Sequence, residues 1–357
     1  MRLLFRADAS VEIGSGHVMR CATLAGYLAA AGHDVGFLCR DAPGNLNTWL
    51  EQQGMPVKHL SNLNEPAAAE AADISASKAA LDSSRYDWII VDHYQLGVHW
   101  ETEMAELADH IMAIDDLGRD HCCHLLLDQN YPNPMHSRYR TSVKPECEVL
   151  LGPRFALVRP EFSTLRAHSL ARRRDSVSRL LVFMGGTDSR NETTKVLNGI
   201  ALAKVTSLVV DVIVGSGNPH RLAVEAACAR LSAAALHVQT ARMFELMAAA
   251  DCAIGAGGSA SWERCVLGLP ALVTILAANQ AAIAQALCAA GACQVLGSQD
   301  NVTPDDYANA LQLLTGEQLR RMSHVAATIC DGQGTARVAT RLTGERGPNM
   351  PSGHLHA

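Results

Sequence analysis

Apolar and polar positions alternate along this chain in blocks that predict short strands followed by helices. In the first half, apolar runs predict strands at residues 3–6, 35–39, 57–60, 87–92, 110–114 and 125–127. Helical spacing predicts helices between them, at 17–31, 46–53, 67–81 and 100–108. The run Trp88-Ile89-Ile90-Val91 is apolar throughout, as strands buried on both faces of a parallel sheet are. This alternation predicts a doubly wound α/β domain.

The same alternation begins again at strand 179–184. Further strands are predicted at 208–214, 236–239, 252–254, 271–275 and 295–296, and helices start near 191, 219 and 279 or span 242–250, 260–267, 304–315 and 317–330. Residues 131–160 are predicted to be irregular, and 166–178 to be a polar, basic connection. We therefore expect two Rossmann-like α/β domains, residues 1–165 and 176–342, with an interdomain cleft. A last helix at 334–342 is expected to pack back toward the first domain, and residues 343–357 to form a disordered tail.

Composition narrows the class of partner. The 357 residues carry a formal charge of −6 and no long basic run, which argues against nucleic acid as a partner. No apolar run reaches the ~18 residues of a membrane span, so no membrane partner is expected. Eleven cysteines occur without a C-x-x-C pair, and the first residues predict a strand rather than a signal peptide. These features predict a reducing, cytoplasmic setting.

The tetrapeptide His121-Cys122-Cys123-His124 contains four residue types that bind metals. Adjacent side chains on extended backbone point to opposite faces, so four consecutive ligands cannot converge on one ion. We therefore predict no metal site.

A glycine loop precedes the first helix, in the stretch Ile13-Gly14-Ser15-Gly16-His17. Glycines allow a ligand to approach the backbone closely, and the free N–H groups at a helix start favour an anion. The helix dipole there disfavours a positive charge on His17, so a neutral imidazole is a candidate general base. The alternative is that Gly14 and Gly16 only form a turn before an ordinary helix residue.

Polar residues follow several strands of the first half. In an open parallel sheet, ligands bind at the carboxyl ends of strands, so these residues are expected to line one crevice. The alternative for each is capping of the following helix. The residues are Asp8, Asp92, His93, Asp115, Asp116 and Asn130.

Two glycine loops of the second half, Gly185-Gly186 and Gly257-Gly258-Ser259, also follow strands. Backbone N–H groups and the Ser259 hydroxyl could bind a diphosphate. Glu263 falls one helical turn after Ser259, where a carboxylate can accept both hydroxyls of a ribose; the alternative is an acid that complements the helix dipole. No lysine follows the glycines, which argues against an ATPase.

Taken together, the motifs resemble the family of PseG, the hydrolase of pseudaminic acid biosynthesis. They are Phe5-Arg6-Ala7-Asp8, the residues 13–20, Val91-Asp92-His93-Tyr94, Asp115-Asp116-Leu117, Asp128-Gln129-Asn130, Leu151-Gly152-Pro153 and the residues 183–188. That family releases UDP from UDP-2,4-diacetamido-2,4,6-trideoxy-β-L-altropyranose. It is similar in fold to the GT-B glycosyltransferases, MurG in particular.

The resemblance implies that His17 is the general base, that Gly257, Gly258, Ser259 and Glu263 bind UDP, and that Asp8, Asp92, His93 and Asn130 contact the sugar. It also implies a metal-independent reaction, and we expect no cofactor. Our hypothesis for the mechanism is that water attacks the anomeric carbon with inversion. We also assign Gly14 and Gly16 to substrate binding and Gly185 and Gly186 to UDP binding. A glycosyltransferase that uses a UDP-sugar, a hydrolase of a related nucleotide sugar and a non-catalytic sensor remain alternatives.

Overall fold

A computed structural model describes residues 1–61, 69–82, 84–130, 139–205 and 207–345 of the chain. The chain divides into two compact units, which we call unit 1 (Met1–Val158 and the segment from Gln333) and unit 2 (Arg159–Gly332). The last helix therefore lies in unit 1, whereas the predicted boundaries assigned it to the second domain. Residues 131–138 and the tail from residue 346 lie outside the described residues.

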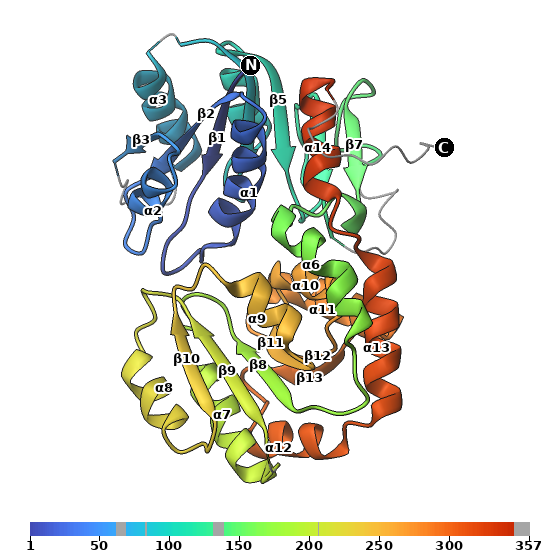
Figure 1. Ribbon diagram of the computed structural model, residues 1–357. Helices are drawn as coiled ribbons and strands as arrows, with labels where there is room; N and C mark the ends of the chain where they lie inside the picture. Colours follow the sequence, from blue (N-terminus) through green and yellow to red (C-terminus); the bar gives the residue numbers. More distant parts are fainter. Residues whose placement is uncertain (62–68, 83, 131–138, 206, 346–357) are drawn as a thin grey trace. The chain divides into compact units, whose positions relative to one another are not determined.

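Unit 1 is built on a parallel sheet of seven strands in the order β3-β2-β1-β4-β5-β6-β7 (Figure 1). The strands are β1 (Arg2–Ala7), β2 (Asp34–Arg40), β3 (Val57–Leu60), β4 (Tyr86–Asp92), β5 (Ala108–Ile114), β6 (Leu125–Asp128) and β7 (Glu148–Leu151). The helices are α1 (Gly16–Ala30), α2 (Asn47–Gln52), α3 (Ala69–Leu81), α4 (Val98–Met104) and α14 (Gly334–Thr343), with a short 3₁₀ turn at Pro153–Phe155.

Successive residues of β1 and β4 bury opposite faces of this sheet. Leu3 and Phe5 belong to a core that includes residues of α1 and α14, whereas Leu4 belongs to a second core with residues of α3 and α4. The indole N–H of Trp88 donates a 3.0 Å hydrogen bond to the carbonyl of Leu342 in α14. Since both faces of the sheet are buried against apolar side chains, the strands have continuous runs of apolar residues in the sequence.

Unit 2 has a parallel sheet of six strands in the order β10-β9-β8-β11-β12-β13. The strands are β8 (Arg179–Phe183), β9 (Val209–Val214), β10 (Ala234–Val238), β11 (Cys252–Ala256), β12 (Ala271–Ile275) and β13 (Gln294–Ser298). The helices are α6 (Pro160–Ala171), α7 (Glu192–Ala203), α8 (Arg221–Cys228), α9 (Met243–Ala249), α10 (Ala260–Val266), α11 (Ala278–Ala290), α12 (Pro304–Leu313) and α13 (Gly316–Ile329). The predicted pair of Rossmann-like α/β folds is confirmed.

Three predicted elements were wrong. The helix expected at 100–108 ends at Met104, because β5 already begins at Ala108. The strand β7 lies within 131–160, a segment predicted to be irregular. The predicted basic connection is partly helical, because α6 extends to Ala171. One of its arginines, Arg166, donates to the carbonyls of Val266 and Ala327.

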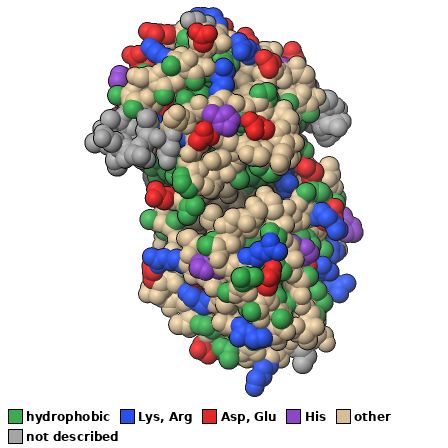
Figure 2. All heavy atoms as spheres, turned by 90° about the vertical axis from the view of Figure 1, so that its left-hand side faces the viewer, with side chains coloured by type: hydrophobic (Ala, Val, Ile, Leu, Met, Phe, Trp, Pro, Cys, Tyr) green, Lys and Arg blue, Asp and Glu red, His purple; other side chains and the backbone are tan. Residues whose placement is uncertain are grey.

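The surface carries both signs of charge. Basic and acidic side chains are interspersed over the face shown in Figure 2. None of the helices in the described part of the chain has the length and apolar character that a membrane crossing requires.

Candidate active site

The strand order of unit 1 reverses between β1 and β4, which are neighbours in the sheet. Such a switch point is where doubly wound sheets bind ligands, because the loops after the two strands diverge there. The loop after β1 leads to His17 at the start of α1, and β4 ends at Asp92. Two of the predicted site residues, His17 and Asp92, therefore lie beside this switch point.

His17 and Asp92 form a buried pair. The Nδ1 atom of His17 lies 2.6 Å from Oδ1 of Asp92, whose side chain is fully buried. The carboxylate is an acceptor, so Nδ1 carries the proton and donates it in this hydrogen bond, which leaves the lone pair on Nε2. Among the described residues, no hydrogen bond involves Nε2 of His17. The imidazole is thus held in the tautomer that accepts a proton at Nε2.

Arg20 holds Asp92 from the other side. It donates from Nε to Oδ2 at 2.5 Å and from Nη2 to Oδ1 at 2.6 Å, so the carboxylate is bound in a bidentate manner. Burial by itself raises the pKa of Asp92, but the charges of Arg20 and His17 outweigh it and hold the pKa well below its usual value. Asp92 therefore stays ionised, and the pair Asp92–Arg20 is neutral as a whole.

From the sequence we assigned no function to Arg20, although its spacing from His17 indicated that the two side chains lie together. Arg20 follows His17 by three residues, a spacing that places both side chains on one face of a helix. Tyr94 was likewise missed as a neighbour of the histidine. Its ring lies nearly perpendicular to that of His17, with the centroids 4.6 Å apart.

The glycine loop before α1 is compact. Gly14 has a φ of +81° and donates its N–H to the carbonyl of Ser10 at 2.8 Å, so a side chain at this position would strain the backbone. Gly16 is exposed, and an added Cβ would meet no atom within 4 Å. The turn itself needs Gly14 but not Gly16, so the space around Gly16 remains open to a ligand.

Asp8 and His93 lie in a second buried network, on the other face of the sheet. The carboxylate of Asp8 is 2.6 Å from Nη1 of Arg6 and 3.3 Å from Nε2 of His93. Arg6 also binds Asp73 of α3, at 2.6 Å. The backbone N–H of Gln95 donates to Nδ1 of His93, so Nε2 carries the proton of this ring. The side chains of Asp8 and Asp92 are buried and already paired with arginines. They are therefore better suited to hold neighbouring side chains in place than to contact a sugar.

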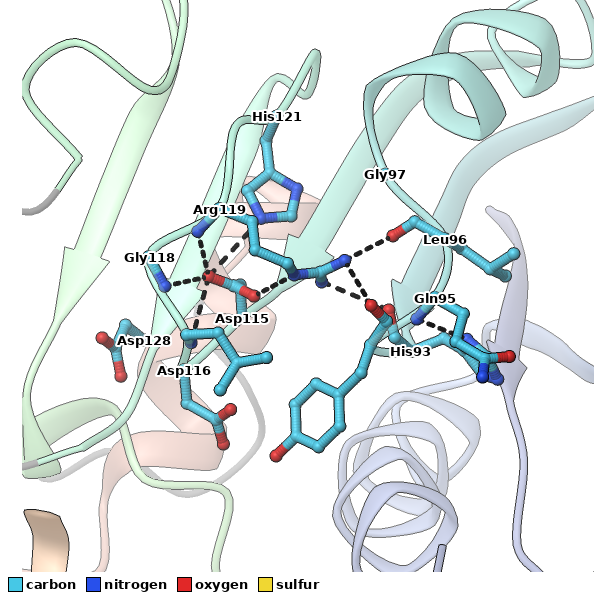
Figure 3. A network of polar contacts seen from close by, with 12 residues as sticks. His93, Gln95, Leu96, Gly97, Asp115, Asp116, Gly118, Arg119, His121 and Asp128 are labelled. Atoms are coloured by element: carbon cyan, nitrogen blue, oxygen red, sulfur yellow. Dashed lines mark hydrogen bonds and ion pairs between the residues drawn. The ribbon is translucent and has the colours of Figure 1, made fainter. Parts of the chain in front are cut away.

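The loop after β5 forms a third network, shown in Figure 3. Oδ2 of Asp115 accepts the backbone N–H groups of Gly118 and Arg119, at 2.7 and 3.1 Å, and Oδ1 accepts from Nε of Arg119 at 2.8 Å. Asp115 thus organises its own loop; the described chain has no helix between β5 and β6, so helix capping does not apply to it. Asn130 is buried, and its backbone N–H donates to Asp128. Asp116 contacts Arg20 at 3.4 Å.

The side chains of residues 121–124 point to different partners. His121 contacts Glu101, at 2.5 Å, whereas Cys123 lies 3.7 Å from the sulfur of Cys147. His124 accepts from the backbone N–H of Ile111. Within the described ranges, no group of three or more His, Cys, Asp or Glu residues could hold a metal ion.

His121 provides a test of the buried charges by pH. Burial lowers its pKa, but Asp115 and Glu101 outweigh this and raise it to about 9. A raised pKa gives stability that is complete below the unfolded value, near 6.5, and is lost as the pH rises through about 9. We expect the free energy of unfolding to fall between pH 6.5 and 9, by up to roughly 3 kcal/mol from this group.

Urea denaturation of His121→Gln over this pH range measures that contribution. The variant should show a flatter pH profile than the wild type, while His99→Gln, at an exposed position, should reproduce the wild-type slope. Parallel profiles for the wild type and His121→Gln would mean that His121 is not charged between its two carboxylates.

Unit 2 has its own switch point, between β8 and β11. The predicted UDP loops follow these two neighbouring strands. Gly185 has a φ of +92°, and the carbonyl of Gly186 accepts from Gly215 at 2.9 Å. A Cβ on Gly257 would come within 3.0 Å of Ala284, so packing alone also favours glycine there. The N–H groups of these loops are brought to one edge of the sheet.

Ser259 is the N-cap residue of α10, and Glu263 lies one turn later on that helix, as expected from their spacing. Ser259 is exposed and its side chain makes no capping hydrogen bond, which leaves the hydroxyl available to a ligand. Glu263 is half-buried; burial raises the pKa of its carboxyl, and the charges of Arg159 and Arg264 oppose that shift. Arg264 is occupied by the carbonyl of Ala256, to which it donates at 2.8 Å.

Comparison with known proteins supports these assignments of fold. No family model matches the sequence. A. baumannii MurG aligns with a TM-score of 0.68 and 16% identity, over 96% of this chain and 99% of that protein. The chain has a GT-B-like fold.

Two curated relatives match in sequence. The chain is 28% identical over 221 residues to a UDP-2,4-diacetamido-2,4,6-trideoxy-β-L-altropyranose hydrolase of Campylobacter jejuni, covering 62% of this chain and 72% of the relative. It is 27% identical over 208 residues to the spore coat polysaccharide biosynthesis protein SpsG of Bacillus subtilis, covering 57% and 61%. The resemblance expected from the motifs is confirmed, and in this GT-B-like chain both switch points carry predicted site residues.

Proposed function

We propose that the chain is an enzyme of nucleotide-sugar metabolism that releases UDP from UDP-2,4-diacetamido-2,4,6-trideoxy-β-L-altropyranose by hydrolysis. The sequence similarity to a hydrolase with that substrate supports the choice of sugar. The GT-B-like fold is compatible with a UDP-sugar substrate. The observation that carries the reaction type is the buried Asp92–His17 pair with the lone pair of His17 on Nε2.

In this proposal Nε2 of His17 takes a proton from water as the water oxygen attacks the anomeric carbon. The bond from that carbon to the phosphate oxygen breaks, the configuration inverts, and UDP leaves with the bridging oxygen. Asp92 and Arg20 act as positioning residues, because they fix the tautomer of the base. The N–H groups after β8 and β11 bind the phosphates and stabilise the developing charge. Glu263 accepts the ribose hydroxyls.

The direct test is UDP release from the altropyranose substrate and from its nearest epimers, with and without an added acceptor sugar. Release without an acceptor supports hydrolysis, whereas release only in its presence would indicate a glycosyltransferase. Binding without any release would indicate a sensor. In ¹⁸O-water the label should appear on the sugar, and label on UDP would mean attack at phosphorus.

Glu263→Ala is expected to weaken UDP binding about ten-fold or more, since a carboxylate that binds two hydroxyls contributes roughly 1.5–3 kcal/mol. Isothermal titration with UDP measures this change. Glu225→Ala, which removes an exposed carboxylate of α8, is the matched control and should bind UDP as the wild type does. Unchanged affinity in Glu263→Ala would contradict the ribose assignment.

A further inference from the structure

The loop that follows β4 is the part of unit 1 that brings Tyr94 against His17. It runs from His93 to Gly97 and contains no helix or strand. The hydrogen bonds inside it are few: Leu96 donates its N–H to the carbonyl of His93 at 3.4 Å, and Gln95 donates to the His93 ring at 3.1 Å. Its far end is held by Glu70, which accepts the N–H of Gly97 at 2.8 Å. Between these points the carbonyls need partners from elsewhere.

Arg119 supplies those partners. Its Nη1 atom donates to the carbonyls of Tyr94 and Leu96, each at 2.9 Å, and its Nη2 atom donates to the carbonyl of His93 at 3.2 Å (Figure 3). One guanidinium thus binds three carbonyls within four residues of the loop. A lysine could not do this, because its single ammonium has no rigid fork of donors.

The guanidinium is itself fixed in place. Its Nε atom donates to Oδ1 of Asp115 at 2.8 Å, and the Asp115 side chain is fully buried. The other oxygen of Asp115 accepts from Gly118 N, Arg119 N and the hydroxyl of Tyr139. The loop after β5, anchored by one carboxylate, therefore presents Arg119 to the loop after β4.

The contacts of Arg119 bear on the candidate base, His17, through Tyr94. Tyr94 packs against the imidazole of His17 at a centroid distance of 4.6 Å, and His17 is held at Nδ1 by Asp92. The ring of His17 is thus fixed on one side by Asp92 and on another by Tyr94, whose backbone carbonyl is bound by Arg119. A displacement of the loop would leave the Asp92 contact in place and change the environment of Nε2.

We propose that Arg119 is a positioning residue for the hydrolysis: it fixes the His93–Gly97 loop and with it the Tyr94 ring against His17. This inference rests on the proposed function. An ion pair between Arg119 and Asp115 could form without the three carbonyl contacts. Stability of that pair therefore does not explain these contacts, whereas a positioning role does.

Arg119→Lys and Arg119→Ala separate these possibilities. Lysine keeps a charge beside Asp115 but loses most of the carbonyl bonds. We expect kcat for UDP release to fall about ten- to 100-fold in both variants, because small displacements of catalytic groups have effects of that size. The KM should change by less than about three-fold, since the binding groups are untouched. The melting temperature of Arg119→Lys should stay near that of the wild type.

Arg85→Ala is the matched control, because Arg85 also binds one carboxylate, Asp109, but is exposed and contacts no loop carbonyl among the described residues. It should keep wild-type kcat. If Arg119→Lys also kept wild-type kcat, Arg119 would serve only to pair with Asp115, and the inference would be overturned while the proposed hydrolysis stood.

A second measurement does not depend on activity. The proton chemical shifts of the His17 ring report its packing against Tyr94, and His17→Ala identifies the signals. These shifts should change in Arg119→Lys and stay fixed in Arg85→Ala. Should the wild type fail to release UDP, the proposed function fails, yet unchanged His17 shifts in Arg119→Lys would still be needed to overturn the positioning by Arg119.

Discussion

Replacing His17 by alanine is expected to lower kcat for UDP release by about 10²–10⁴-fold, the usual contribution of general-base assistance. The affinity for UDP should change little, because the residues proposed to bind UDP belong to unit 2. Asp92 would lose one of its hydrogen bonds but keep both from Arg20, so the carboxylate remains paired. Steady-state kinetics together with UDP titration measure the two effects separately.

The control for this variant is His99→Ala, at an exposed position of α4. It should show wild-type kinetics. A His17→Ala protein with near wild-type kcat would remove the histidine from the mechanism. A protein with lost UDP affinity but normal kcat would instead assign His17 to binding.

The largest effect on stability is expected from Arg6→Ala. Arg6 is fully buried between Asp8 and Asp73, at 2.6 Å from each. Burial lowers the pKa of Arg6, but the two carboxylates outweigh it and raise the pKa above its usual range. Removing the guanidinium leaves two buried carboxylates, for which Arg40 is the remaining cation that contacts both. Breaking such a pair costs about 3–5 kcal/mol.

Urea denaturation of the full chain measures this loss of stability in Arg6→Ala, with Arg2→Ala as the control on the same strand. Arg2 lies 3.6 Å from Asp34 with both side chains exposed, and an exposed pair contributes about 1 kcal/mol or less. Arg6→Lys keeps the charge and should lie between the two. A loss below 1 kcal/mol in Arg6→Ala would mean that the carboxylates are relieved by protonation or by water.

The strands and most helices could be predicted because both faces of each sheet are buried, so each strand has a run of apolar residues in the sequence. The strand β7 was missed because it has four residues at the edge of its sheet, and two of them are only partly buried and one exposed. The helix before β5 was extended too far because its composition continues past Met104, and only the sheet register at Ala108 ends it.

The candidate site was found in part. The position of His17 followed from a local motif, a glycine loop between a strand and a helix. Its pairing with Asp92 joins residues 75 positions apart, and it depends on β1 and β4 being neighbours, which no local pattern states. The same holds for Arg119, whose partners lie 23–26 residues away on another strand's loop. The sequence predicted that these polar residues gather at the carboxyl ends of the strands, but it could not predict which of them pair with one another.

The placement of α14 has a consequence for how the chain is made. Val338, Ala339 and Leu342 belong to the core that also contains α1 and β1, so unit 1 is built from two segments separated by the whole of unit 2. Domains fold during synthesis as their residues emerge from the ribosome. Unit 2 is one continuous segment and can fold without the rest of the chain. The apolar face around Trp88 in unit 1, in contrast, stays uncovered until α14 has been synthesised. A chain truncated before Gln333 would therefore contain all of unit 2 but leave the core of unit 1 incomplete and prone to aggregation.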